Sequence, residues 1–273
     1  KYNFKTDQGI KFLTSGDAMR IAGENPDYHQ RDLLGAIDRG EFPSWTVKMQ
    51  IMPAAEAPKY RFNPFDLTKV WPYRDYPLIT IGKMALNRNP DNYFAEVEQA
   101  AFNPAHFVPG IGPSPDKMLQ GRLFSYGDTH RYRLGANHMQ LPINRPREVE
   151  VDNYSRDGAM RFDGNQGREK NYEPNSFGGP VQSGSPIYLP SAVNGETGSY
   201  ETETHPEDND FVQAGNLYRL MDEAAKRRLI DNIAGSLSQV SKEDIVERSV
   251  ANFRKADPEY GERVGAAVRK LRV

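Results

Sequence analysis

The sequence predicts an α+β fold, and three features of the 273-residue chain predict it. Apolar residues alternate with polar ones at several places in residues 1–90, as they do in half-buried strands. Residues 91–206 are mostly irregular, apart from one long helical stretch. From residue 207 onward, apolar residues recur at helical spacing. We therefore expect three parts, namely residues 1–90, 91–206 and 207–273.

Three alternating stretches in the first part are expected to form strands. The first begins at residues 2–4, turns at 6–9 and resumes at 10–12, the second runs through 45–53, and the third covers 78–86. Because long excursions separate them, these strands fit part of an antiparallel β-barrel with helical insertions. Missing strands would leave an open edge, which another polypeptide would have to cover.

Capping signals place two helices between the first strands. Ser15 is expected to cap a helix, and Pro26-Asp27 is expected to open another that ends at Gly40. Residues 92–101 predict a short helix, which Pro104 and the two residues before it break.

The stretch 115–135 predicts the most informative helix of the chain. Ser114 is expected to be its N-cap, Pro115 suits the first helical position, and Asp116 complements the positive end of the helix dipole. Gly135 is the expected stop signal.

One stripe of this helix carries unusual residues for a face that looks buried. At about 100° per residue, it contains Met118, Arg122, Tyr126, Thr129 and Arg133. Buried charge requires a partner, so we expect something anionic to lie against this stripe. Spacing alone favours a plainer interpretation, which is an amphipathic helix with an internal Arg–Tyr hydrogen bond.

Tyr126 follows Arg122 by four residues, so the two side chains meet on the helix surface. A free tyrosine has a pKa of about 10, but a guanidinium alongside favours the phenolate and a trivalent metal favours it further. Phenolate oxygen is one of the few known axial ligands of ferric haem. The spacing therefore also allows a haem-ligand interpretation.

The later parts of the chain differ in character. A structureless loop as long as residues 136–206 is uncommon inside a compact domain, so it predicts either a wrapping arm or a disordered linker. Its aromatic residues argue against disorder; these are Tyr154, Phe162, Tyr172 and Phe177. In the helical part, Ser241 with Asp244 resembles a capping box, and Asp257-Pro258 is expected to open the last helix.

Composition excludes several classes of protein. The net charge is −2 with both signs interspersed, so nothing suggests nucleic-acid binding. No apolar run approaches the roughly 20 residues that span a bilayer, and the first residues lack the apolar core of a signal peptide. The chain has no cysteine, which fits a soluble cytoplasmic protein.

The string RLFSYGDTHRYRLG at 122–135 resembles the proximal haem-ligand motif of the monofunctional haem catalases. Further segments resemble catalase segments in family order: KTDQGIK (5–11), PSWTVKMQ (43–50), FNPFDLTKVWP (62–72), NRNPDNYFAEVEQAAFNP (87–104), PDKMLQG (115–121) and NYEPNSFGGP (171–180). The resemblance implies haem b as cofactor, with Tyr126 as the axial iron ligand and Arg122 as its hydrogen-bond partner. It also implies that the haem pocket contains Pro104, Met118, His130 and Arg133.

The resemblance implies that two molecules of hydrogen peroxide are converted to water and dioxygen. Catalases are longer than this chain, and their distal histidine and asparagine lie upstream of the KTDQGIK strand, so the chain resembles the C-terminal part of a small-subunit bacterial catalase. The expected partners are the missing N-terminal part and further copies in a homotetramer, in which residues 136–206 form the wrapping arm. Two alternatives are a non-catalytic haem-binding fragment that needs a companion chain, and a catalase-like haem enzyme acting on lipid hydroperoxides.

A second cofactor has weaker support from the motifs. In the family, the lysine and tryptophan at the positions of Lys5 and Trp71 help to form a surface NADPH site. The family's histidine two positions after the tryptophan is Tyr73 here, and this departure weighs against nucleotide binding.

Overall fold

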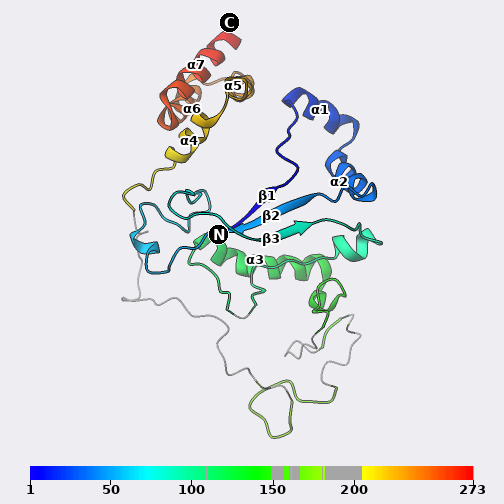
Figure 1. Cartoon of the computed structure of the whole chain (residues 1–273). Helices are drawn as coiled ribbons and strands as arrows, with labels where there is room; N and C mark the ends of the chain where they lie inside the picture. The colour runs from blue at the N-terminus through cyan, green and yellow to red at the C-terminus, as the bar shows by residue number, and fades with distance from the viewer. Residues whose placement is uncertain are drawn as a thin grey trace. The chain divides into compact units, whose positions relative to one another are not determined.

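The computed structural model describes residues 1–108, 110–148, 157–159, 161, 167–179, 181 and 205–272. The chain forms two compact units (Figure 1). The first unit combines Lys1–Asn89 with Glu201–Val273, and the second is Pro90–Tyr200.

The first unit contains a three-stranded antiparallel sheet in the order β1-β2-β3. Its strands are β1 (Tyr2–Thr6), β2 (Ser44–Met49) and β3 (Ile79–Ala85). The sheet has three strands and is open in the described part of the chain, so the expectation that it is part of an antiparallel β-barrel is not confirmed. The predicted return to strand at residues 10–12 is wrong, because these residues extend past the last pair of the β1–β2 ladder, Thr6 with Trp45.

The register gives the sheet two different faces. Tyr2, Met49 and Ile79 are aligned across the three strands on one face, while the next row, Asn3, Lys48 and Thr80, lies on the other. Apolar side chains on the first face are open to solvent, with Tyr2 62% and Phe4 54% exposed.

Two helices connect β1 to β2. They are α1 (Ser15–Glu24) and α2 (Tyr28–Asp38), and Gly40 follows α2 with a positive φ of 76°. The expected cap at Ser15 is wrong by one residue, because the side chain of Thr14 accepts the hydrogen bond from the Asp17 amide.

The C-terminal part of the first unit consists of four helices, α4 (Val212–Leu220), α5 (Glu223–Leu237), α6 (Glu243–Ala256) and α7 (Pro258–Leu271). Their shared core contains Tyr218, Ile230, Ala234, Val246, Val250, Tyr260, Val264 and Val268. Asp257 caps α7 as predicted, by accepting from the amides of Glu259 and Tyr260. The capping role predicted for Ser241 is wrong, since α6 has Lys242 at its N-cap position and no side-chain capping bond.

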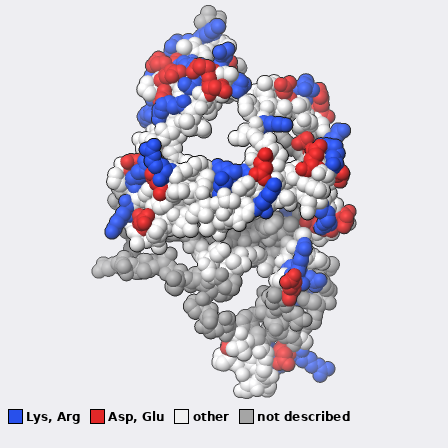
Figure 2. Space-filling model, in the orientation of Figure 1, with Lys and Arg blue, Asp and Glu red and all other residues white. Residues whose placement is uncertain are grey.

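Both signs of charge are mixed on the visible surface of these helices (Figure 2). Arg263 pairs with Glu223 and Glu259, and Arg254 pairs with Glu262. Within the described helices, such neighbouring pairs offset the basic charge that a nucleic acid would require in a continuous stripe.

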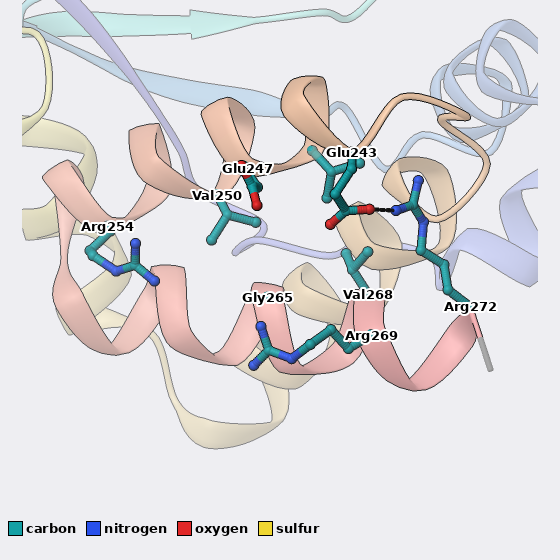
Figure 3. A pocket seen from close by; sticks show the side chains of 9 residues that line it. Glu243, Glu247, Val250, Arg254, Gly265, Val268, Arg269 and Arg272 are labelled. Atoms are coloured by element: carbon teal, nitrogen blue, oxygen red, sulfur yellow. Dashed lines mark hydrogen bonds and ion pairs between the residues drawn. The ribbon is translucent and has the colours of Figure 1, made fainter.

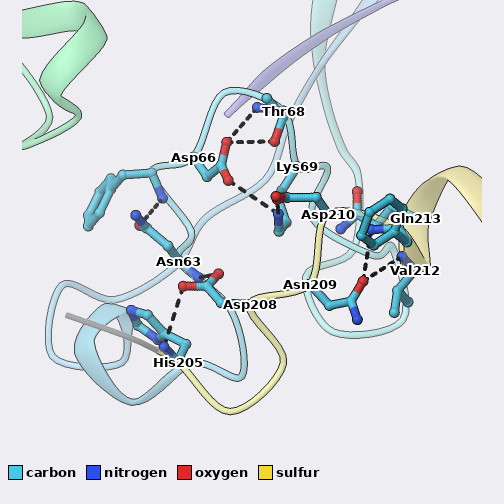
Figure 4. Close-up of polar contacts among 12 residues, drawn as sticks. Asn63, Asp66, Thr68, Lys69, His205, Asp208, Asn209, Asp210, Val212 and Gln213 are labelled. Atoms are coloured by element: carbon cyan, nitrogen blue, oxygen red, sulfur yellow. Dashed lines mark hydrogen bonds and ion pairs between the residues drawn. The ribbon is translucent and has the colours of Figure 1, made fainter. Parts of the chain in front are cut away.

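A polar cluster ties the residues before α4 to the segment at 61–70 (Figure 4). The buried ammonium of Lys69 lies 3.2 Å from an Asp66 oxygen and 3.1 Å from an Asp210 oxygen. Burial opposes the charged form of Lys69, but hydrogen bonds to Asp210 and Asp66 raise its pKa above the usual value. The paired charge therefore holds the start of the helical part against this segment.

The second unit contains the helix predicted from the 115–135 stretch. Its described elements are a π-helical turn, η2 (Phe94–Glu98), the long helix α3 (Lys117–Leu134) and a short 3₁₀ turn, η3 (His138–Gln140). The predicted cap at Ser114 is wrong, because Asp116 accepts the hydrogen bond from the Leu119 amide and the helix begins after it. Gly135 ends the helix as predicted, with a φ of 104°.

The predicted wrapping arm is described only in part. Tyr154 and Phe162 lie outside the described residues. Tyr172 and Phe177 belong to the described segment 167–179, where the Asn175 side chain donates to the Tyr172 carbonyl and accepts from the Phe177 amide. Across the described residues, no helix is long and apolar enough to cross a bilayer.

Candidate functional site

Helix α3 packs through one side only. His130 is the buried residue of this helix, and the neighbouring positions Leu119, Leu123 and Leu134 are half-buried. The adjacent stripe, which the sequence predicted to be buried, is mostly exposed; Met118, Arg122, Thr129 and Arg133 are exposed and Tyr126 is half-buried. The burial prediction is therefore wrong for this chain, because most of the stripe is exposed to solvent and, of its exposed residues, Arg133 is the one that bonds to a described segment before the helix.

Arg122 and Tyr126 form the central pair of the exposed stripe. The guanidinium Nη2 of Arg122 donates a hydrogen bond to the phenol oxygen of Tyr126. The guanidinium carbon also lies 5.1 Å from the centre of the Tyr126 ring. A full positive charge therefore contacts both the oxygen and the ring of the tyrosine, as the four-residue spacing predicted.

His130 lies one turn after Tyr126, and its ring contacts the Tyr126 ring. The two ring centres are 6.2 Å apart with an interplanar angle of 76°, which is an edge-on arrangement. The Nε2 atom of His130 lies 2.8 Å from the Phe102 carbonyl oxygen, and Nδ1 lies 3.2 Å from the guanidinium of Arg133. Both ring nitrogens are therefore engaged.

Arg133 binds the backbone that precedes α3. Its guanidinium donates to the carbonyl oxygens of Glu98 and Ala100, the latter at 2.7 Å. These bonds use two of the five N–H groups of an arginine, and the contact with His130 uses another. Arg133 is thus anchored by main chain, and its expected role at the haem edge stays a prediction.

Pro104 lies half-buried in the loop that follows η2. Asn103, its neighbour, accepts from the Ala105 amide at 2.9 Å, and its side-chain nitrogen lies 3.6 Å from where a Cβ on Gly127 would be. The loop therefore lies against α3 beside Tyr126.

Asn144 is a positioning residue that sequence reasoning missed. Its amide nitrogen donates to the carbonyls of Gln99 and His138, both at 2.9 Å, and its oxygen accepts from the Ala101 amide at 2.8 Å. An asparagine in a loop has no spacing signal, since its partners here are backbone groups distant in sequence.

The two residues predicted for NADPH lie in the first unit. Lys5 donates from Nζ to the phenol oxygen of Tyr73 at 2.6 Å. Trp71 is buried, its indole N–H donates to the Pro64 carbonyl, and Lys1 rather than Lys5 lies over its ring. The residue that departs from the family pattern is thus the one that engages Lys5.

A separate hollow lies between α6 and α7 (Figure 3). Val246, Val250 and Val268 line it, and the Glu243–Arg272 ion pair stands at its margin. These valines belong to the core of the helical part, so the hollow follows from the crossing of two helices.

The Arg122–Tyr126 pair fits an iron porphyrin. Among the described residues no cluster of three or more histidine, cysteine or carboxylate side chains could hold a metal ion. The phenol of Tyr126 is a candidate single donor, and it is the one that a guanidinium contacts. A phenolate suits ferric iron as an axial ligand, and the adjacent guanidinium compensates its charge. The side chain of Met118, 62% exposed on the same stripe, adds apolar surface for a flat ring.

Comparison with known proteins identifies the family to which the chain belongs. The family model described as Catalase matches residues 1–179, and the one described as Catalase-related immune-responsive matches residues 204–268. A bromoperoxidase-catalase from Streptomyces venezuelae is 63% identical over 272 residues, which are 100% of this chain and 56% of that protein. A catalase from Streptomyces coelicolor is 61% identical over 274 residues, with the same coverage of 100% and 56%.

Solved structures give the same result. The structure of a bacterial catalase superposes with a TM-score of 0.89 and 42% identity, and the match includes 98% of this chain and 55% of the bacterial catalase chain. Catalase A from Saccharomyces cerevisiae superposes with a TM-score of 0.85 and 43% identity, and covers 98% and 56%. The chain thus spans little more than half the length of the relatives that it matches, and over that span it belongs to the catalase family.

Proposed function

We propose that this chain is the proximal part of a haem catalase that converts hydrogen peroxide to water and dioxygen. The observation that carries the proposal is the Arg122–Tyr126 pair on an exposed stripe of α3. A single phenol paired with a guanidinium suits one axial position of ferric haem b, and the family membership supports the same assignment.

The contribution of these residues would be electrostatic and positional. When bound, haem supplies the redox chemistry that peroxide disproportionation requires. Tyr126, as phenolate, would hold the iron and stabilise its higher oxidation states over the ferrous state. Arg122 would keep the phenol deprotonated and moderate its donation, because it contacts the same oxygen. His130, Arg133, Met118 and Pro104 would line the haem pocket around this pair.

The rest of the predicted architecture follows from this assignment. We infer that β1, β2 and β3 are part of an antiparallel barrel completed by residues upstream of the KTDQGIK strand, and that these residues carry the distal side of the pocket. Residues 91–206 would then hold the ligand helix and the wrapping arm, and the complete protein would be a homotetramer. The exposure of the α3 stripe favours one alternative, namely that this chain without its companion is an inactive haem-binding fragment.

For NADPH the support is mixed. Lys5 is exposed and carries a positive charge that could bind a nucleotide phosphate. Its ammonium group, however, donates a hydrogen bond to Tyr73, which carries no positive charge. We expect NADPH to bind weakly, and titration with NADPH under fluorescence detection would measure it. Tyr73→His should strengthen that binding, most clearly below about pH 6.5, because it removes the phenol that holds Lys5 and adds an imidazole that is protonated there. No gain in binding would remove Lys5 and Trp71 from the proposed site.

The test of the main proposal is Tyr126→Phe in the haem-loaded protein, with Tyr132→Phe as the matched control. Tyr132 lies on the same helix and is 87% exposed, so its hydroxyl is not expected to matter. Tyr126→Phe should lose nearly all bound haem or turnover, measured by the iron-to-protein ratio and by oxygen release. Wild-type turnover in Tyr126→Phe would show that the ligand assignment is wrong.

A further inference from the structure

We propose that His130 is a positioning residue that fixes the direction of the Tyr126 phenol, because its ring is held by a hydrogen bond from Nε2 to the Phe102 carbonyl and by one from Arg133 to Nδ1. The inference deepens the proposed function and rests on it, because the direction of the phenol matters only if its oxygen binds the iron. Three observations carry it, and they concern the partners of each ring nitrogen, the burial of the ring and its contact with Tyr126.

The partners of His130 determine its tautomer. Arg133 Nη2, at 3.2 Å from Nδ1, has protons to donate and no lone pair to offer, so Nδ1 must be the acceptor. The carbonyl oxygen of Phe102, at 2.8 Å from Nε2, can only accept, so Nε2 must carry the proton. A proton on Nδ1 would point at the guanidinium of Arg133, and both bonds would not form together.

These bonds hold a buried ring in one orientation. His130 is 8% exposed, and its ring also contacts His138, with centres 5.6 Å apart. The Phe102 bond connects the ring to the loop that contains Pro104, while Arg133 connects it to the carbonyls of Glu98 and Ala100. An imidazole held at both nitrogens cannot turn without breaking one of these two hydrogen bonds.

The fixed ring lies edge-on to Tyr126, while the guanidinium of Arg122 is 5.1 Å from the ring of Tyr126. Tyr126 therefore has a charged contact through Arg122 and a rigid aromatic contact through His130. If Tyr126 holds the iron, a change in the His130 contact would change the orientation of the phenol and, with it, the symmetry of the surroundings of the metal.

The first measurement examines the tautomer in the chain without haem. Nitrogen-15 NMR of the histidine rings at pH 8 should show one imidazole with its proton on Nε2, assigned to His130 by its loss in His130→Gln. A proton on Nδ1, or rapid exchange between the two tautomers, would overturn the proposal, because the ring would then not be held as described.

The second measurement uses electron paramagnetic resonance of the ferric haem-loaded protein. His130→Leu removes both hydrogen bonds, and it should shift the rhombic splitting of the high-spin signal. His130→Gln should return the splitting toward wild type, because its amide nitrogen can donate to the Phe102 carbonyl. His29→Leu, in α2 and exposed, is the control and should give the wild-type splitting.

The outcomes separate the positioning role from the ligand assignment. If Tyr126→Phe abolishes the tyrosinate signal in resonance Raman spectra while His130→Leu keeps the wild-type splitting, the positioning role is wrong and the ligand assignment stands. If Tyr126→Phe keeps that signal, the proposed function itself is wrong. Should His130→Leu fail to fold, the comparison of wild type with His130→Gln and the NMR tautomer decide the question.

Discussion

In the proposed ligand site, Arg122 would contribute charge and His130 would contribute shape around Tyr126. Arg122 supplies a positive charge at the phenol oxygen, and its exposure leaves that charge accessible to an incoming anion. His130 supplies a rigid neighbour, and its own partners are main-chain and guanidinium groups. The same phenol can therefore be tuned electrically through one residue and geometrically through the other.

Replacing Arg122 should separate the electrical effect from the geometric one. In Arg122→Ala, haem should stay bound, but the charge-transfer bands of its visible spectrum should shift, because the phenolate loses its charge partner. Arg131→Ala is the control; Arg131 lies on the other side of α3 and pairs loosely with Asp128 at 4.0 Å. Identical spectra for Arg122→Ala and wild type would remove Arg122 from the site.

The pairing of Arg122 with Tyr126 could be predicted because helical spacing alone brings residues four apart together. The partners of Arg133 and His130 could not, since they are the carbonyl oxygens of Glu98, Ala100 and Phe102, and every residue has a carbonyl. Burial of the stripe was predicted wrongly for a similar reason. Helical periodicity shows which residues share a face, but it does not show whether that face is covered or by which part of a protein.

At the scale of elements, helix ends show where local sequence suffices. Asp257 and Gly135 stand where capping rules put them, because each is the strongest capping residue in its neighbourhood. Near residue 115 two candidates compete, and Asp116 caps the helix in place of Ser114. Capping rules rank residue types, but the turn of the backbone decides which of two nearby side chains reaches a free amide.

The cap of α7 gives a prediction at this scale. Asp257 accepts from two amides of the first turn and pairs with Arg219 at 2.7 Å. Asp257→Ala should lower the free energy of unfolding of the helical part by about 1 kcal/mol, within the usual range for lost caps. Asp257→Asn keeps the capping oxygen and loses the charge, so it should cost less. Equal losses in chemical denaturation would show that the ion pair, not the cap, stabilises this end.

The same residue has a pH signature. The hydrogen bond from Arg219 and those from the Glu259 and Tyr260 amides hold the pKa of Asp257 below its usual value. A carboxylate with a lowered pKa in the folded state adds stability above the unfolded pKa of about 3.9, and this stability is lost as pH falls through the folded pKa. The difference in the free energy of unfolding between wild type and Asp257→Asn should therefore have its full size at pH 6 and disappear in acid.

The crossing of α6 and α7 requires a glycine. A Cβ on Gly261 would lie 2.6 Å from the Cα of Arg254, whereas a Cβ on Gly235 in α5 would meet nothing within 4 Å. Gly261→Ala should destabilise the helical part by about 1–3 kcal/mol through overpacking. Gly235→Ala, the matched control, should stabilise it by up to about 1 kcal/mol. A neutral Gly261→Ala in thermal unfolding would mean that the two helices can separate at little cost.

At the scale of the whole molecule, the sheet carries the strongest sign of a missing neighbour. Its apolar face is open, with Ile79 at 47% and Phe4 at 54% exposed, and all residues of β3 are exposed. A sheet with open edges and one bare apolar face is an aggregation hazard unless another polypeptide covers it. Strand alternation predicted the three strands, but it could not predict closure, which depends on strands outside them.

A companion chain should cover this face. The chain should be co-expressed with the part of the Streptomyces venezuelae relative that it does not match. Co-expression should raise the soluble yield of the chain and lower its binding of an apolar dye, because Tyr2, Phe4 and Ile79 become buried. Phe4→Asp, on the apolar face, should abolish both effects, whereas Thr80→Asp, on the polar face, should leave them intact. If Phe4→Asp assembles as well as Thr80→Asp, the sheet is not the docking surface.

Light scattering of the assembled pair tests the proposed wrapping arm, residues 136–206. Four copies of each part are expected, because the arm is proposed to join the subunits of a homotetramer. A stable single pair would contradict that role of the arm in assembly.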